Sequence, residues 1–225
     1  MNNPHRRHFL GRSLGAAQLA VAGVLLPAAG RALVCGLADF QGQARPLPHV
    51  VAEVGRVRAA LGDGTDVLWG EQASRARLLA LSESGALAEY EILHFATHAI
   101  VSRLAPSMSR ILLADASLTF ADILALRLRA RLVVLSTCES LLGETQAGDE
   151  IMSLALAFLW AGAQAVVASL WPVEDEATSR LMAAFYRHYA AGVVAAQALQ
   201  RAQHELRAAG ASAYDWAGFV VIGAP

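Results

Sequence analysis

The chain lacks lysine altogether, and its charge of either sign is sparse. Its 18 basic residues are therefore all arginines; against 19 acids they leave a formal net charge of −1. The arginines are scattered along the sequence, so no basic stripe exists to neutralise phosphates, and we expect no nucleic-acid partner. The absence of lysine also excludes the phosphate-binding G-x-x-x-x-G-K-[ST] loop, which removes the main support for nucleotide binding.

Only two cysteines, Cys35 and Cys138, are present, and only 16% of the residues are charged, while 56% are hydrophobic. Two cysteines cannot build a multi-disulfide framework. The apolar content excludes a disordered chain, because disorder requires low hydrophobicity and a high net charge. At 225 residues the chain is long enough to bury one hydrophobic core without disulfides, and we expect a single domain.

The stretch from Ile151 to Val173 carries no charge and meets the length of about 20 residues that a membrane-spanning helix needs. Its composition changes half way, however, from helix-forming Leu, Ala and Met to the β-preferring pair Val166-Val167. We therefore expect a buried helix up to Ala161, a turn at Gly162 and a buried strand from Ala165, and no stable membrane span.

A second uncharged stretch, from Ser13 to Gly30, follows the twin arginines Arg6-Arg7. The combination resembles a Tat export signal, which places such a signal in residues 1–32. Alternatively, Phe9 to Pro27 forms the first elements of the domain itself. The sequence leaves both open, and with them the localisation: cytoplasmic, or exported if residues 1–32 are a signal.

After this segment, strand-like apolar runs alternate with amphipathic helical segments. The helices are expected from His49, from Ser74 as N-cap, from Phe120, and over Glu174–Gly192. Such alternation predicts an α/β fold with a mostly parallel sheet. The strands are expected at Leu33–Ala38, Asp66–Trp69, Glu91–Thr97, Arg110–Ala114, Leu132–Thr137, Ala165–Trp171 and Phe219–Gly223.

Two of these strands end in reactive side chains. The run EILHFATH ends in His98, and LVVLSTC ends in Cys138. A thiol is nucleophilic as the thiolate, so it needs a neighbouring base or cation at neutral pH. If the two strands are neighbours in the sheet, the imidazole and the sulfur share one edge, and a Cys/His dyad for acyl transfer becomes feasible. The alternative is a buried cysteine of purely structural role.

His94 and His98 are spaced four residues apart, which in a helix would suggest a pair of metal ligands. In a strand, His94 would instead lie deep in the sheet, and no third ligand is nearby. We expect no metal and no cofactor.

Four segments resemble, in order and spacing, the CHAT domain family of caspase-like cysteine peptidases related to separase. The likeness extends over residues 33–225 and implies a caspase-like three-layer α/β/α sandwich in which His98 and Cys138 match the catalytic histidine and cysteine. The segments are LHFATH (Leu93–His98), LSTCES (Leu135–Ser140), VVASLWPVEDEAT (Val166–Thr178) and WAGFVVIGAP (Trp216–Pro225).

The resemblance implies cleavage of a protein or peptide substrate through a thioester on Cys138, with the backbone N–H groups of Ala99 and Cys138 stabilising the oxyanion. Relatives usually carry glycine where this chain has Ala99. If the position requires a positive φ, alanine resists it by roughly 1 kcal/mol or more. The competing hypothesis is therefore a pseudo-protease that acts as a protein-interaction module.

Asp175 matches an aspartate that in separase-like relatives lies near the pocket for a basic substrate residue, and Asp149 and Glu150 are further candidates. Acids at the first turn of a helix are also expected from the helix dipole alone. The resemblance further implies control by a regulatory protein or by an N-terminal region that precedes this chain.

Overall fold

A six-stranded sheet organises the part of the chain that the computed structural model describes, namely residues 30–102, 105–137 and 149–224. Its strands lie in the order β2-β1-β3-β7-β8-β9, and all neighbours are parallel except β9, which runs antiparallel to β8. The expected α/β fold with a mostly parallel sheet is confirmed. The strands are β1 Ala32–Gly36, β2 Thr65–Trp69, β3 Ile92–Thr97, β7 Leu132–Thr137, β8 Ala165–Ser169 and β9 Phe219–Gly223.

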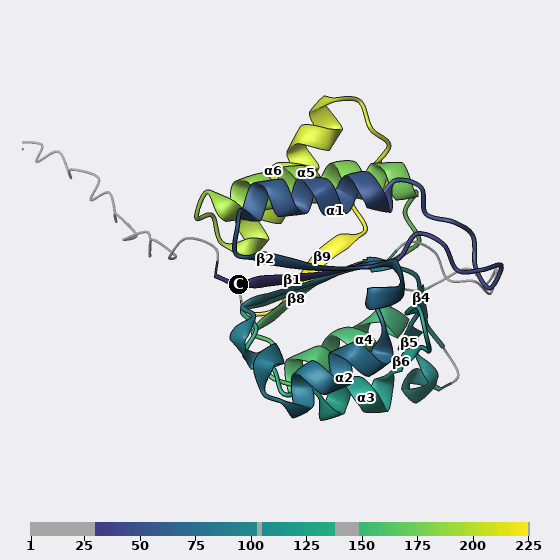
Figure 1. The fold of residues 1–225 in the computed structure, drawn as a ribbon. Helices are drawn as coiled ribbons and strands as arrows, with labels where there is room; N and C mark the ends of the chain where they lie inside the picture. The colour runs from purple at the N-terminus through teal and green to yellow at the C-terminus, as the bar shows by residue number, and fades with distance from the viewer. Residues whose placement is uncertain (1–29, 103–104, 138–148, 225) are drawn as a thin grey trace, which may run out of the picture.

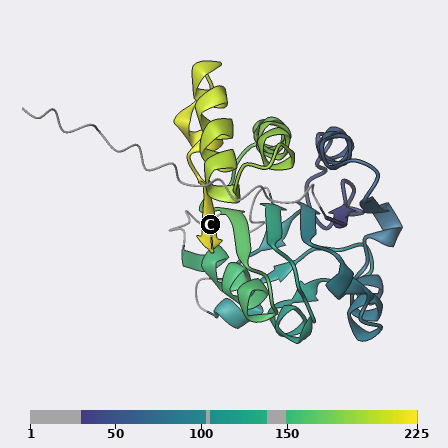
Figure 2. The same cartoon turned by 90° about the vertical axis from the view of Figure 1, so that its left-hand side faces the viewer.

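Helices cover both faces of this sheet and complete three layers (Figure 1). Helices α1 (Val50–Leu61), α5 (Asp175–Ala190) and α6 (Ala195–Ala208) pack side by side on one face, as Figure 2 also shows. Helices α2 (Arg75–Glu83), α3 (Phe120–Ala125) and α4 (Asp149–Trp160) cover the other. A short helix α7 (Ala213–Trp216) contacts α5 and α6, and 3-10 turns occupy η1 Gly70–Gln72, η2 Ala86–Glu89 and η3 Pro106–Met108.

The alternation of side chains along β3 builds a separate hydrophobic core on each face. Ile92 and Ala96 join the core under α1, α5 and α6, whereas Leu93 and Phe95 join the core above α2, α3 and α4. Because both faces are covered, the strand is apolar throughout instead of alternating with polar residues. The same alternation places His94 and His98 on the α1/α5 side.

The uncharged stretch from Ile151 to Val173 folds as its composition predicts. Helix α4 ends at Trp160, Gly162 takes a positive φ of 114°, and β8 begins at Ala165 between two other strands. In the described ranges, no helix is both long and apolar enough to cross a membrane. One detail differs from expectation: α4 is not buried all round, because Leu156 and Trp160 are 56% and 82% exposed.

The segment Arg110–Ala114, expected as one strand, forms only the two-residue strand β5 (Arg110–Ile111). It pairs with β4 (Ala99–Ile100) and β6 (Leu118–Thr119) in a small antiparallel sheet. After β5, the N–H of Leu112 still bonds to the His98 carbonyl, and Asp115 then accepts hydrogen bonds from the backbone N–H groups of Arg75 and Ala76 at the start of α2. The expected strand is thus shorter, and its last residues contact α2 instead.

Candidate active site

Strands β3 and β7 are neighbours in the sheet and bring two predicted site positions to one edge. Thr97 pairs with Thr137, and these are the residues that directly precede His98 and Cys138. The condition on which the dyad hypothesis depends, that the two strands are neighbours, is therefore met. Cys138 lies outside the described residues, so its contact with His98 stays a prediction.

His98 is held in a buried, oriented position at the end of β3. The residue is only 1% exposed, and its Nε2 lies 2.8 Å from the backbone carbonyl oxygen of Arg45. A carbonyl only accepts hydrogen bonds, so Nε2 carries the hydrogen, and in the neutral ring Nδ1 is the basic nitrogen. The Phe40 ring packs against the imidazole with centroids 4.6 Å apart.

Sequence reasoning missed both Phe40 and Arg45. They belong to the loop between β1 and α1, and Arg45 acts through its backbone, which carries no residue-specific signal. The position of this loop, after the parallel strand next to β3, was the one available hint, because sites in open α/β sheets lie beyond the carboxyl ends of the strands.

Asp175 begins helix α5 and lies within electrostatic reach of His98. Its Oδ2 accepts a hydrogen bond of 2.7 Å from the backbone N–H of His49, whereas Oδ1 is buried without a partner in the described residues. Burial raises the pKa of Asp175; the bond from His49 and the field of His98 oppose this rise. Asp175 is thus an acid in the first turn of a helix, and its role as a substrate contact stays a prediction.

Ala99 lies in β4 and does not have a positive φ. Among the non-glycine residues that the structure describes, Gln41 alone has one. Leu112 donates its N–H to the His98 carbonyl over 2.9 Å, so Ala99 and Ile111 form a non-hydrogen-bonded pair of the antiparallel ladder. The N–H of Ala99 consequently points away from β5. The positive φ that would penalise alanine does not occur here.

The sequence comparisons decide the family. The CHAT domain family matches residues 12–224. The chain belongs to the CHAT domain family. It is also similar to tetratricopeptide repeat protein 28 of Mus musculus (41% identity over 108 residues) and of Homo sapiens (40% over 108 residues). Each match covers 47% of this chain but only 4% of the relative.

Further buried oxygens occur near the site of this CHAT domain. Ser136 Oγ, on the strand that leads to Cys138, and Thr178 Oγ1, in the first turn of α5, have no hydrogen-bond partner among the described residues. Buried polar atoms are rarely left unsatisfied, so such atoms near a site require an explanation. Asp149 and Glu150 begin α4, and their side chains lie outside what the structure describes.

His94 is buried in the CHAT core, two residues below Ala96 on β3. Its Nε2 lies 2.9 Å from a Glu53 carboxylate oxygen, and its Nδ1 lies 3.0 Å from the Tyr186 hydroxyl. All three residues are at most 1% exposed. Both ring nitrogens are thus engaged in a network that ties α1 and α5 to the sheet. No cluster of three metal-binding side chains occurs in the described ranges.

Cys35, the second cysteine, is a core residue of the CHAT fold, as its position in the first strand predicts. It is 2% exposed in β1, and burial raises the pKa of its thiol to about 12. A buried thiol with so high a pKa is a poor nucleophile. Thiol chemistry in this chain therefore depends on Cys138.

Proposed function

We propose that this CHAT domain is a cysteine endopeptidase that cleaves a protein or peptide substrate with Cys138 and His98. The observation that carries the proposal is the pairing of Thr97 with Thr137, because these two residues directly precede His98 and Cys138 in the sequence. The family membership and the hydrogen bond that fixes the His98 ring support it.

The proton steps follow from the tautomer of His98. Nδ1 takes the proton of the Cys138 thiol, and the thiolate attacks the scissile carbonyl carbon to form a tetrahedral oxyanion. Collapse breaks the peptide C–N bond as the imidazolium returns the proton to the leaving amine, which leaves a thioester. Water then attacks the thioester and gives a proton to His98, which returns it to the leaving sulfur of Cys138 as the acid is released. The Arg45 carbonyl keeps the ring oriented and stabilises the imidazolium.

The oxyanion would be stabilised by the backbone N–H groups of Ala99 and Cys138. The direction of the Ala99 N–H, away from β5, is compatible with this role. A preorganised donor of this kind contributes about 3 kcal/mol to transition-state stabilisation.

Asp175 is proposed as the contact for a basic substrate side chain beside the cleaved bond. Its buried Oδ1 has no partner in the described residues, and a cationic donor from the substrate would satisfy it. Burial raises the pKa of Asp175, and a cation bound at Oδ1 would oppose this rise.

The chain spans about 4% of the tetratricopeptide repeat proteins that it resembles. Control by a partner protein, or by a further region of a longer chain, is therefore part of the proposal. Such control would act on the order of the loops around His98 and Cys138.

The test is incubation of the purified chain with a peptide library, followed by mass spectrometry of the products. Wild type should cleave, whereas Cys138→Ala and His98→Ala should not, and Asp175→Asn should lose the preference for a basic residue beside the cut. The matched control Cys35→Ala should cleave like wild type. Cleavage that survives in Cys138→Ala would overturn the dyad. No cleavage and no thiol labelling in wild type would favour the competing interaction module.

A further inference from the structure

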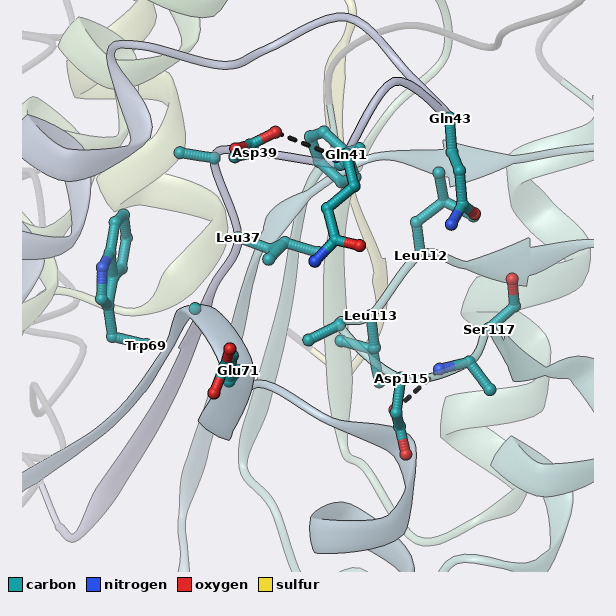
Figure 3. A pocket seen from close by; sticks show the side chains of 15 residues that line it. Leu37, Asp39, Gln41, Gln43, Trp69, Glu71, Leu112, Leu113, Asp115 and Ser117 are labelled. Atoms are coloured by element: carbon teal, nitrogen blue, oxygen red, sulfur yellow. Dashed lines mark hydrogen bonds between the residues drawn. The ribbon is translucent and has the colours of Figure 1, made fainter.

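A pocket of about 330 Å³ is lined in part by Phe40 and Leu112, which both contact His98. Figure 3 shows the side chains that line this pocket. We call it the acidic pocket. Three segments line it, and each lies at the end of a strand: residues 37–43 without Gly42 follow β1, residues 69–71 lie at the end of β2, and residues 112–117 follow β5.

The acidic pocket lies where open α/β sheets bind ligands. In the sheet, β2 lies on one side of β1 and β3 lies on the other, so the order in which the chain adds strands reverses at β1. Ligands of open α/β sheets bind at such a reversal, beyond the carboxyl ends of the strands. Two pocket residues reach the site itself: Phe40 packs on the His98 ring, and Leu112 donates its N–H to the His98 carbonyl. These two residues connect the pocket to the His98 site.

The floor and the rim of the acidic pocket differ in chemistry. Leu37, Phe40, Leu112 and Leu113 are all buried and form an apolar floor. The rim carries the exposed acids Asp39, Glu71 and Asp115, and no arginine lines the pocket. Asp115 directs its carboxylate to the backbone N–H groups at the start of α2, which leaves Asp39 and Glu71 as the acids that a ligand can reach. Within the described ranges no arginine forms an ion pair with any of the three.

The walls are held in place without a ligand. Asp39 Oδ1 accepts the N–H of Gln41 over 2.9 Å, and the N–H of Gln43 bonds to the Phe40 carbonyl over 2.9 Å. On the opposite wall, the N–H of Ala114 bonds to the Ala73 carbonyl over 2.9 Å. A preformed hollow with an apolar floor and a few convergent polar groups is typical of a ligand site.

We propose that the acidic pocket receives a lysine or arginine side chain of the polypeptide cleaved at His98 and Cys138, at a position distinct from the one that Asp175 contacts. Long cationic side chains place their methylene stem on apolar surface and their charged head at a polar rim, which matches this pocket. The proposal rests on the proposed peptidase function for the identity of the ligand.

The cleavage experiment uses a peptide library in which one position at a time, counted from the cut, carries arginine, lysine or norleucine. Wild type should show, at one position, a kcat/KM at least tenfold higher for the basic residues. The double variant Asp39→Asn/Glu71→Gln should reduce this ratio below threefold, with norleucine peptides cleaved as before. The control Glu83→Gln, an exposed acid outside the pocket, should keep the ratio. An unchanged ratio in the double variant would overturn the proposal.

A binding experiment separates the pocket from the chemistry. Calorimetry with the Cys138→Ala chain compares an arginine peptide with the same peptide carrying citrulline, its neutral isostere. Arginine should bind at least fivefold more tightly, and the double variant should abolish the difference. If arginine binds more tightly than citrulline but the wild-type chain cleaves no peptide, the proposed peptidase function would be overturned and the proposed cation-binding pocket would be supported. Equal affinity of the two peptides, with cleavage that depends on Cys138, would overturn the pocket alone.

Discussion

At the scale of single residues, the site divides into side chains that a sequence can reveal and backbone groups that it cannot. His98 and Asp175 are predicted from motifs, and the structure places them within electrostatic reach of each other. The Arg45 carbonyl, which fixes the His98 tautomer, is supplied by the fold, because any residue at position 45 has the same backbone oxygen. Phe40 is missed since one aromatic in a loop carries no periodic pattern.

Ala99 provides the first prediction. Removal of its N–H in Ala99→Pro should lower kcat/KM about 100-fold, because one oxyanion donor is lost. Ala99→Gly should stay within threefold of wild type, since Ala99 takes no positive φ that glycine would relieve. Peptide cleavage kinetics measure both.

The proline variant needs a control for folding. β4 is an edge strand of its sheet, and the Ala99 N–H points away from β5, so proline removes no ladder bond. Its thermal midpoint and the alkylation rate of Cys138 should therefore match wild type. A large gain of activity in Ala99→Gly would contradict this account, because it would show that alanine at position 99 impairs the oxyanion-binding site.

At the scale of elements, helix ends and buried strands follow from composition. Helix α6 was not predicted, although its buried residues recur at helical spacing; they are Ala195, Ala198, Leu199, Ala202 and Leu206. The end of α5 was predicted from Gly192, which has a positive φ of 85°.

The turn between α4 and β8 depends on glycine more strongly than other helix ends do. A Cβ at Gly162 would lie 2.3 Å from the Leu128 carbonyl oxygen, with φ at +114°, whereas a Cβ at Gly192 meets nothing within 4 Å. Gly162→Ala should therefore reduce the free energy of unfolding by about 3 kcal/mol, and Gly192→Ala by about 1 kcal/mol. Urea denaturation compares the two variants, and equal losses would show that the contact with Leu128 relaxes freely.

The link between α2 and α3 makes stability depend on acid pH. Arg75 forms two hydrogen bonds of 2.6 and 2.8 Å with Asp122, and these bonds lower the pKa of Asp122 to about 2. A carboxyl with a depressed pKa stabilises the fold above its unfolded pKa of about 3.9, and this contribution is lost as the pH falls toward 2.

Asp122→Asn should thus reduce the free energy of unfolding by about 2 kcal/mol at pH 7, with the difference from wild type disappearing between pH 4 and pH 2. Urea titrations at several pH values measure it, with Asp63→Asn, an exposed loop acid, as the control. A difference that persists at pH 2 would assign the loss to packing instead of charge.

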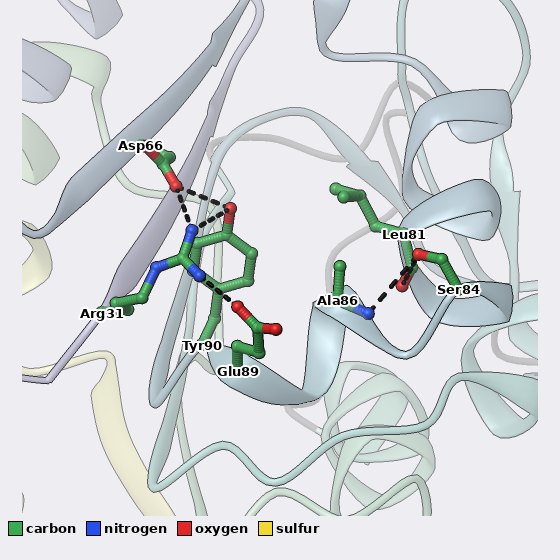
Figure 4. A network of polar contacts seen from close by, with 7 residues as sticks. All are labelled: Arg31, Asp66, Leu81, Ser84, Ala86, Glu89 and Tyr90. Atoms are coloured by element: carbon green, nitrogen blue, oxygen red, sulfur yellow. Dashed lines mark hydrogen bonds and ion pairs between the residues drawn. The ribbon is translucent and has the colours of Figure 1, made fainter.

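At the scale of the whole molecule, Arg31 anchors the N-terminal end of strand β1 in the described part of the chain. Its guanidinium contacts Asp66, Glu89 and Tyr90, and its carbonyl accepts the N–H of Glu91 (Figure 4). Strand β1 begins at the next residue, Ala32, which pairs with both neighbouring strands. The contacts of the sheet thus begin before Leu33, where the sequence places the domain boundary.

Two truncations test this boundary. A chain that starts at Gly30 should keep all contacts of β1, whereas one that starts at Leu33 loses Arg31 and Ala32 and should unfold at least about 4 °C lower. Calorimetry gives both midpoints. Sequencing of the mature protein then decides between an export signal and an intact segment, and any cleavage should fall before Arg31. Equal midpoints would show that Arg31 and Ala32 are dispensable.

The central claim, that His98 activates Cys138, is tested most directly by the pH dependence of iodoacetamide alkylation, followed by peptide mass spectrometry. The method needs no substrate, and Cys35 stays silent because burial raises the pKa of its thiol to about 12. Wild type should alkylate Cys138 rapidly at pH 6, and His98→Ala should shift the profile to the ordinary thiol pKa of about 8.5. Identical profiles for the two proteins would contradict the dyad.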